Sequence, residues 1–139
     1  MVDDVLLNKA ATIERCVARA REEYAAAGDH FDTDFSRQDA AVLNIQRACE
    51  AALDMGHHLI RRDRLGLPQS ARQVFDLLAQ AGRIDPTLAE SLKKMVGFRN
   101  IAVHDYQTLL LPITIIVITQ HMDEFLQFSS ALLADKKGL

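Results

Sequence analysis

The chain has 139 residues, of which 49% are hydrophobic, and a formal net charge of −3 from 16 basic and 19 acidic side chains. This composition excludes a disordered chain and predicts a single domain, residues 1–139, large enough to bury a core without a metal or disulfide. A domain that grips long nucleic acid non-specifically is usually basic overall. Any contact with nucleic acid must therefore be made by a local patch.

The N-terminus and the most apolar segment give no sign of export or membrane insertion. Residues 1–4 are acidic where a signal peptide would be basic. The apolar run at residues 109–118 contains Pro112 and has about half the length that spans a bilayer. We therefore expect a soluble, cytoplasmic protein with no membrane partner. Cys16 and Cys49 lack CxxC spacing, so we expect buried, reduced thiols.

The hydrophobic pattern predicts two long helices in the first half of the chain. From Leu6 onwards, apolar side chains recur at alternating steps of four and three, which is typical of an amphipathic helix, and Gly28 ends it. A second long helix is expected to start after Asp34 or Ser36 and to run to Arg62.

Three further helices are predicted in the second half. A short helix spans residues 71–80 and ends at Gly82. Asp85 followed by Pro86 indicates the start of the next helix, and a last helix follows Pro112. Because no strand-like alternation or hairpin signal appears, the predicted fold is all-α, an antiparallel bundle of four to five helices.

The polar side chains of one segment are not explained by core packing. Residues 99–106 carry Arg99, Asn100, His104, Asp105 and Tyr106 directly after an amphipathic helix. On an ideal helix, Arg99 and His104 would lie roughly 140° apart around the axis. They can converge only if the helix ends or distorts between them, or if a second copy of the chain brings them together. Spacing alone leaves open that these side chains merely cap the helix and complement its dipole.

The run of residues 95–106 resembles the signature of HepT-like proteins of the HEPN family. That signature is an Arg, usually followed by Asn, then a His after a short spacer, then one residue and a Tyr, as in Arg99, Asn100, His104 and Tyr106. Residues 51–60 are also similar to the second helix of that family. The resemblance covers the whole domain in length and helix order, and it implies a HEPN-like helical bundle that forms a homodimer.

The resemblance also implies a function. It indicates a ribonuclease toxin of a two-gene toxin–antitoxin pair, acting on RNA with no metal and no other cofactor. The antitoxin would be a minimal nucleotidyltransferase of the MntA type, which transfers AMP onto the motif tyrosine. Carried over to this chain, Arg99 and His104 are the catalytic pair, Asn100 is a supporting residue and Tyr106 is the modified residue. The alternative is a non-catalytic helical binding module that docks a nucleotidyltransferase and presents nucleotide or substrate to it.

The residue types fit the implied chemistry. RNA cleavage without a metal needs a base for the 2′-hydroxyl, an acid for the leaving 5′-oxygen and positive charge near the phosphorus. Histidine can serve either proton role, and arginine offers a fork of donors that matches a phosphate. Since the motif supplies only His104 for proton transfer, a two-fold dimer with both motifs around one cleft would supply the acid and the base.

Other polar side chains are weaker candidates. Asp54 would orient Arg99 or His104 if it were buried, but a surface carboxylate is the more ordinary role. His57 and His58 have no Cys or carboxylate at ligand spacing, so no metal site is expected there. A basic cluster is either a solvated helix end or a local patch for RNA or a partner: Arg61, Arg62, Arg64 and Arg72.

Overall fold

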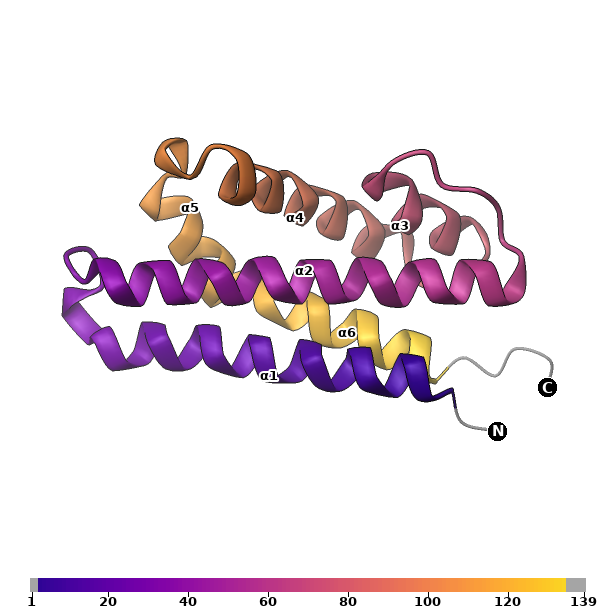
Figure 1. Ribbon diagram of the computed structural model, residues 1–139, viewed down its shortest axis with the longest axis horizontal. Helices are drawn as coiled ribbons and strands as arrows, with labels where there is room; N and C mark the ends of the chain where they lie inside the picture. The colour runs from indigo at the N-terminus through magenta and orange to yellow at the C-terminus, as the bar shows by residue number, and fades with distance from the viewer. Residues whose placement is uncertain (1–2, 135–139) are drawn as a thin grey trace.

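The computed structural model describes residues 3–134, so the polar tail noted at residues 135–139 lies outside the described part. The helices are α1 (Asp4–Ala27), α2 (Phe35–Asp63), α3 (Ala71–Gln80), α4 (Pro86–His104), α5 (Leu111–Ile116) and α6 (Met122–Leu133). Three short turns, η1 (Gly28–His30), η2 (Tyr106–Thr108) and η3 (Val117–His121), connect them. Helix α2 runs antiparallel to α1 and α4 and parallel to α6, and residues 3–134 contain no strand (Figure 1). The predicted all-α bundle is confirmed.

The helix boundaries follow from local capping. The side chains of Asp34, Ser70 and Asp85 each accept a hydrogen bond from a backbone N–H in the first turn of the helix that follows. These N–H groups would otherwise lack a partner, which is why short polar residues start helices. Gly28 ends α1, and Gly82 follows the end of α3. Their φ angles of +55° and +75° are disfavoured for residues that carry a side chain.

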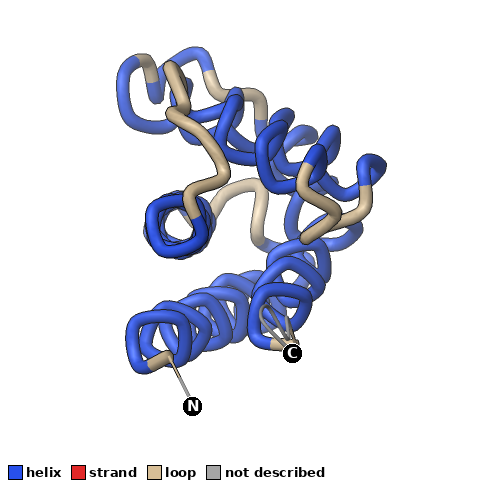
Figure 2. The backbone as a smooth tube through the Cα atoms, turned by 90° about the vertical axis from the view of Figure 1, so that its right-hand side faces the viewer, coloured by secondary structure: helices blue, strands red, loops and turns tan. Residues whose placement is uncertain are grey.

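Helix α2 is the centre of the bundle. It contacts α1, α3, α4 and α6, with α1 and α6 below it and α3 and α4 above it in Figure 2. Its Gly56 allows a close approach, because a Cβ at this position would lie only 2.6 Å from Cγ1 of Val74. Nearby, Phe75 and Phe128 pack edge to face with their ring centroids 5.5 Å apart. These contacts join α2, α3 and α6 into one core.

The predicted last helix is interrupted. The chain forms α5, then a π-helical turn at η3, and then α6. A π turn inserts an extra residue and rotates the buried face. Thr114, which precedes this turn, is only 2% exposed, whereas the neighbouring apolar Ile115 is half-buried.

Two further expectations concern the cysteines and the membrane. Cys16 and Cys49 are both buried free thiols, as predicted. Within residues 3–134, the helices lack the combination of length and apolar character that crossing a bilayer requires.

Candidate functional site

The motif occupies the last turns of α4 and the turn that follows. Helix α4 continues without a break from Arg99 to His104, and the N–H of Asp105 closes it by donating to the carbonyl oxygen of Ile101 at 2.8 Å. The chain then leaves the helix and forms η2, which carries Tyr106. Arg99 and His104 therefore lie on one regular helix, whereas Tyr106 lies beyond its end.

Arg99 is half-buried and faces α2. Its Nε is shielded from solvent and has no hydrogen-bond partner among the described residues. Burial raises the pKa of the Cys49 thiol in α2 to about 12. The positive charge of Arg99 acts to lower this pKa, and the negative charge of Glu50 acts to raise it. A buried donor without an acceptor carries a desolvation cost. The Arg99 guanidinium therefore has a hydrogen-bond donor without an acceptor among the described residues.

His104 lies on a different side of α4. Its side chain is exposed and makes no hydrogen bond within the described part of the chain, while Asn100 is half-buried next to Arg99. Because the helix is regular between Arg99 and His104, their side chains project roughly 140° apart. The structure therefore excludes a helix end or break as the means of bringing them together in one chain. The sequence left two ways for Arg99 and His104 to converge. The one that remains is contact between two copies of the chain.

Tyr106 has a partner that the sequence did not reveal. Its hydroxyl donates a hydrogen bond to Oδ1 of Asp39, near the start of α2, although Tyr106 as a whole is 42% exposed. Desolvation and then the neighbouring Asp39 carboxylate raise the pKa of Tyr106 to about 12. No local motif marks Asp39, because the two residues meet only where the start of α2 lies beside the turn after α4.

A cavity of about 430 Å³ opens beside this pair. Asp39 and Tyr106 are both in its wall, together with Phe35, Gln38 and Gln107. Phe35 is 70% exposed, so an aromatic face is available at the rim. No Lys or Arg lines this cavity among the described residues.

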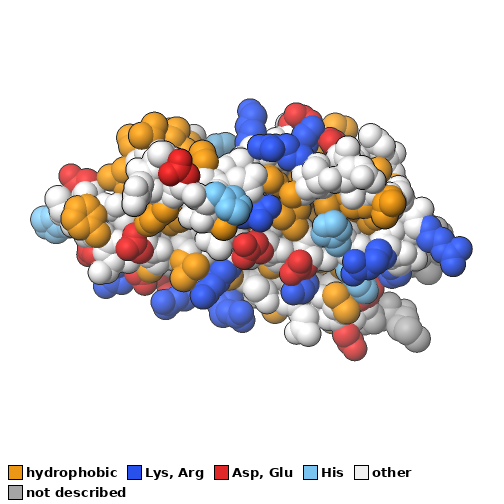
Figure 3. Space-filling view, turned by 45° about the horizontal axis from the view of Figure 1, so that its top comes forward, with side chains coloured by type: hydrophobic (Ala, Val, Ile, Leu, Met, Phe, Trp, Pro, Cys, Tyr) orange, Lys and Arg blue, Asp and Glu red, His pale blue; other side chains and the backbone are white. Residues whose placement is uncertain are grey.

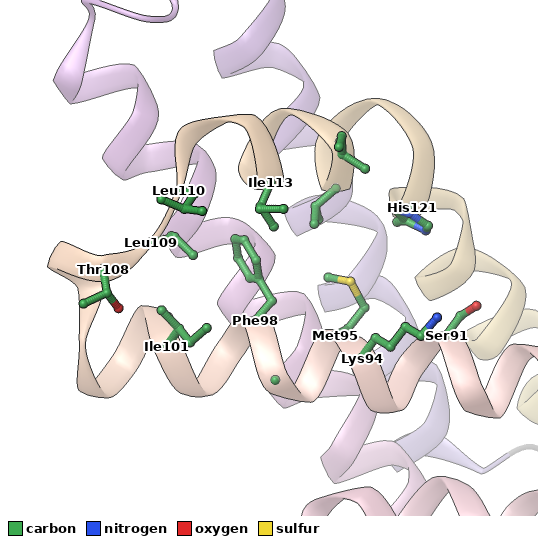
Figure 4. Close-up of a pocket in the computed structure, with 13 residues that line it drawn as sticks. Ser91, Lys94, Met95, Phe98, Ile101, Thr108, Leu109, Leu110, Ile113 and His121 are labelled. Atoms are coloured by element: carbon green, nitrogen blue, oxygen red, sulfur yellow. The ribbon is translucent and has the colours of Figure 1, made fainter.

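A second cavity, of about 450 Å³, is an apolar groove between α4 and the α5–η3 segment (Figure 4). Phe98 and Met95 point into it from α4, and Ile113 faces them from α5. Exposed apolar side chains surround the groove, including Ile101 and Leu110 at 41% and 64% exposure. Figure 3 shows hydrophobic side chains gathered at this end of the molecule.

Asp54 is not buried, so of the two roles set out from the sequence the structure supports the surface carboxylate. Its side chain is exposed and accepts a hydrogen bond from Nζ of Lys9 at 3.0 Å, across the α1–α2 interface. Residues on this face of α2 look toward α1, so Asp54 is an ordinary surface carboxylate and not a residue that orients Arg99 or His104.

One histidine of the pair, His58, and one arginine of the basic cluster, Arg62, contact Asp3 at the start of α1. Nε2 of His58 and Nη1 of Arg62 lie 2.8 and 3.0 Å from the same oxygen of Asp3. Arg72 places its guanidinium over Gly97, 3.1 Å from where a Cβ would be. Within residues 3–134, no three His, Cys, Asp or Glu side chains are arranged to hold a metal ion.

Comparison with known proteins decides the family. The family model described as "Ribonuclease HepT-like" matches residues 13–132. The chain belongs to the HepT-like ribonuclease family. It is 47% identical over 134 residues to the mRNA nuclease HepT of Shewanella oneidensis, covering 96% of this chain and 100% of that protein. The predicted family is confirmed.

Solved structures agree with this assignment. The tri-AMPylated HEPN toxin of Shewanella oneidensis, in complex with an MNT antitoxin, has a TM-score of 0.91 and 46% identity over 96% of this chain and 100% of that chain. A toxin–antitoxin structure with AMP-PNP has a TM-score of 0.89 and 46% identity over 94% of this chain and 99% of that chain. YutE of Bacillus subtilis, at 19% identity over 88% of this chain and 86% of its own, shares the fold with a TM-score of 0.68.

Proposed function

We propose that this chain is the toxin of a toxin–antitoxin pair and that it cleaves RNA with Arg99 and His104. The observation that carries the proposal is the presence of both side chains at the end of α4, on a fold shared over nearly the whole chain with an mRNA nuclease. The comparisons agree with the enzymatic class and the toxin function predicted from the sequence. The arrangement favours this function over a non-catalytic binding module.

The proposed chemistry is attack of a ribose 2′-oxygen on the adjacent phosphorus. The 2′-oxygen–phosphorus bond forms and the bond from phosphorus to the 5′-oxygen breaks, which leaves a cyclic phosphate. His104 is exposed to substrate and takes or gives the proton. Arg99 donates to the phosphate oxygens as their negative charge grows, and Asn100 supports it from the same turn.

A homodimer would complete this site. The reaction needs one proton acceptor and one proton donor, and each motif supplies a single histidine. We propose that two copies place their α4 ends around one cleft, so that one His104 acts as base and the other as acid. The apolar groove beside the motif supports this arrangement, because monomers rarely expose contiguous apolar surface such as that of Ile101, Leu110 and Ile113.

The partner proposed for this chain is a minimal nucleotidyltransferase of the MntA type that transfers AMP to Tyr106. A relative at 46% identity carries three AMP groups and is bound to an MNT antitoxin. Tyr106 suits modification because the residue is 42% exposed and lines a cavity. A nucleotide anion on the motif would compete with an RNA phosphate. We place both reactions in the cytoplasm, where mRNA and ATP are found.

Expression of the wild type and of His104→Ala tests the nuclease function. We expect the wild type to arrest growth and degrade cellular RNA, and His104→Ala to do neither. RNA that remains intact during expression of folded wild-type protein in the absence of the partner would contradict the proposal.

Co-expression with the cognate nucleotidyltransferase tests the modification. We expect a mass increase of one or more AMP units on the peptide that contains Tyr106, and none in Tyr106→Phe. Adenylylation mapped to another residue would refute the assignment of Tyr106.

A further inference from the structure

Asp39 lies where a group that acts on Tyr106 must lie. It accepts the hydrogen bond from the Tyr106 hydroxyl, which is the one proton that this oxygen must lose before it can carry a new substituent. The contact joins the start of α2 to η2, so it is made by the fold and not by neighbours in the sequence. Asp39 is itself exposed, so a proton that reaches it can pass on to water.

We propose that Asp39 is the general base that accepts the phenolic proton of Tyr106 as AMP is transferred to that oxygen. The proposal rests on Tyr106 being the acceptor of AMP, as set out in the proposed function.

The step balances with ATP as the nucleotide donor. A bond forms between Oη of Tyr106 and the α-phosphorus, the bond between the α-phosphorus and the oxygen that bridges it to the β-phosphorus breaks, and pyrophosphate leaves. The proton moves from Oη to Oδ1 of Asp39. Since the pKa of Tyr106 is about 12, only about one phenol in 10⁵ is ionised at pH 7. A positioned base that removes the proton as the new bond forms avoids that scarce anion.

The cavity beside Tyr106 and Asp39 indicates which groups for AMP transfer come from this chain and which come from the nucleotidyltransferase. Its lining includes the aromatic Phe35 and the side-chain amides of Gln38 and Gln107, and no Lys or Arg among the described residues. The Gln38 amide nitrogen also donates to the carbonyl oxygen of Phe31 at 2.7 Å. These groups suit an adenosine moiety better than a triphosphate, whose charge calls for cations. This chain thus supplies the attacking oxygen and the proton acceptor, and the partner must neutralise the phosphates.

The decisive experiment measures the rate constant of AMP transfer to Tyr106 at saturating ATP and nucleotidyltransferase. Asp39→Asn keeps a hydrogen-bond acceptor at the same place but cannot hold the proton. We expect Asp39→Asn to lower the rate constant by about 10²–10⁴-fold and Asp39→Glu to recover part of this loss. Asp32→Asn is the matched control: it removes the same charge from the exposed loop before α2, outside the cavity lining, and should leave the rate constant unchanged.

A second measurement separates proton transfer from mere positioning. Replacing Tyr106 by a fluorinated tyrosine lowers the phenol pKa and so reduces the need for a base. Within the Asp39→Asn background, we expect fluorination to restore the rate constant at least tenfold. Circular dichroism and size-exclusion of the complex confirm that the variant is folded and bound.

Two results would overturn the inference. One is a rate constant for Asp39→Asn within threefold of the wild type; the other is a loss that fluorination does not reduce, which would leave Asp39 as a positioning residue only. Wild-type protein that stays unmodified at Tyr106 with active partner and ATP is a different result, since it refutes the proposed function itself.

Discussion

At the scale of single residues, Arg99 combines a charge with a buried, unpartnered Nε, and we predict that both its charge and its shape matter. Arg99→Lys keeps the positive charge but loses the planar fork that binds two phosphate oxygens at once. We expect at least a tenfold lower rate constant for RNA cleavage, measured with a short synthetic RNA at saturating concentration. Wild-type activity in Arg99→Lys would mean that any local positive charge suffices.

The pair of Tyr106 and Asp39 makes a second residue-level prediction. The folded state raises the pKa of Tyr106 from 10.0 to about 12, through desolvation and then Asp39. The neutral phenol is thus favoured on folding, and its contribution to stability is present below pH 10 and is lost as the pH rises through 12. Asp39→Ala should lower this pKa, as followed by tyrosinate absorbance in a Tyr24→Phe background. Identical titration curves with and without Asp39 would contradict the contact.

At this scale, the sequence could predict only residues that lie close together along the chain. The motif side chains Arg99, His104 and Tyr106 are recognisable because they follow one another within a single turn-and-helix segment. Asp39 could not be predicted, since its role depends on a contact across 67 positions. Two roles stayed open for Asp54 because helical spacing alone does not say whether a carboxylate faces the core or, as here, Lys9.

At the scale of helices, two glycines provide a matched test of packing. A Cβ at Gly56 would lie 2.6 Å from Cγ1 of Val74, a branched side chain held between helices, whereas at Gly97 it would meet the flexible end of Arg72 at 3.1 Å. Alanine gains up to about 1 kcal/mol over glycine inside a helix, but overpacking costs about 1–3 kcal/mol. In urea unfolding, we expect Gly56→Ala to lose roughly 1–2 kcal/mol of unfolding free energy and Gly97→Ala to be neutral or stabilised. Equal effects of the two substitutions would contradict the tight contact of α2 with α3.

The helices themselves were largely predictable, because capping residues and glycines mark their ends. The exception is the π turn at η3, which splits the expected last helix. A pattern of apolar residues with a helical period contains no signal for one inserted residue. It also gives no reason to expect that Thr114 is buried while the neighbouring Ile115 is only half-buried.

At the scale of the whole molecule, the sequence predicts the all-α bundle and the family, and both are confirmed. That residues 1–139 act as a single domain stays a prediction, and so does the homodimer. The case for two copies joins two features that lie close together: a regular helix that holds Arg99 and His104 apart, and an apolar groove along the same helix. Neither feature alone identifies the second copy, but a shared cleft explains both.

The central claim is that two His104 side chains work in one cleft, and a dimer with one wild-type and one His104→Ala protomer tests it most directly. Two different affinity tags allow this mixed dimer to be isolated, and its rate of RNA cleavage is compared with that of both parent dimers. A shared cleft predicts that the mixed dimer is nearly as inactive as His104→Ala, about 10²-fold or more below the wild type, because either the acid or the base is missing. A mixed dimer with half of the wild-type activity, or a wild-type protein that cleaves RNA as a monomer, would contradict the claim.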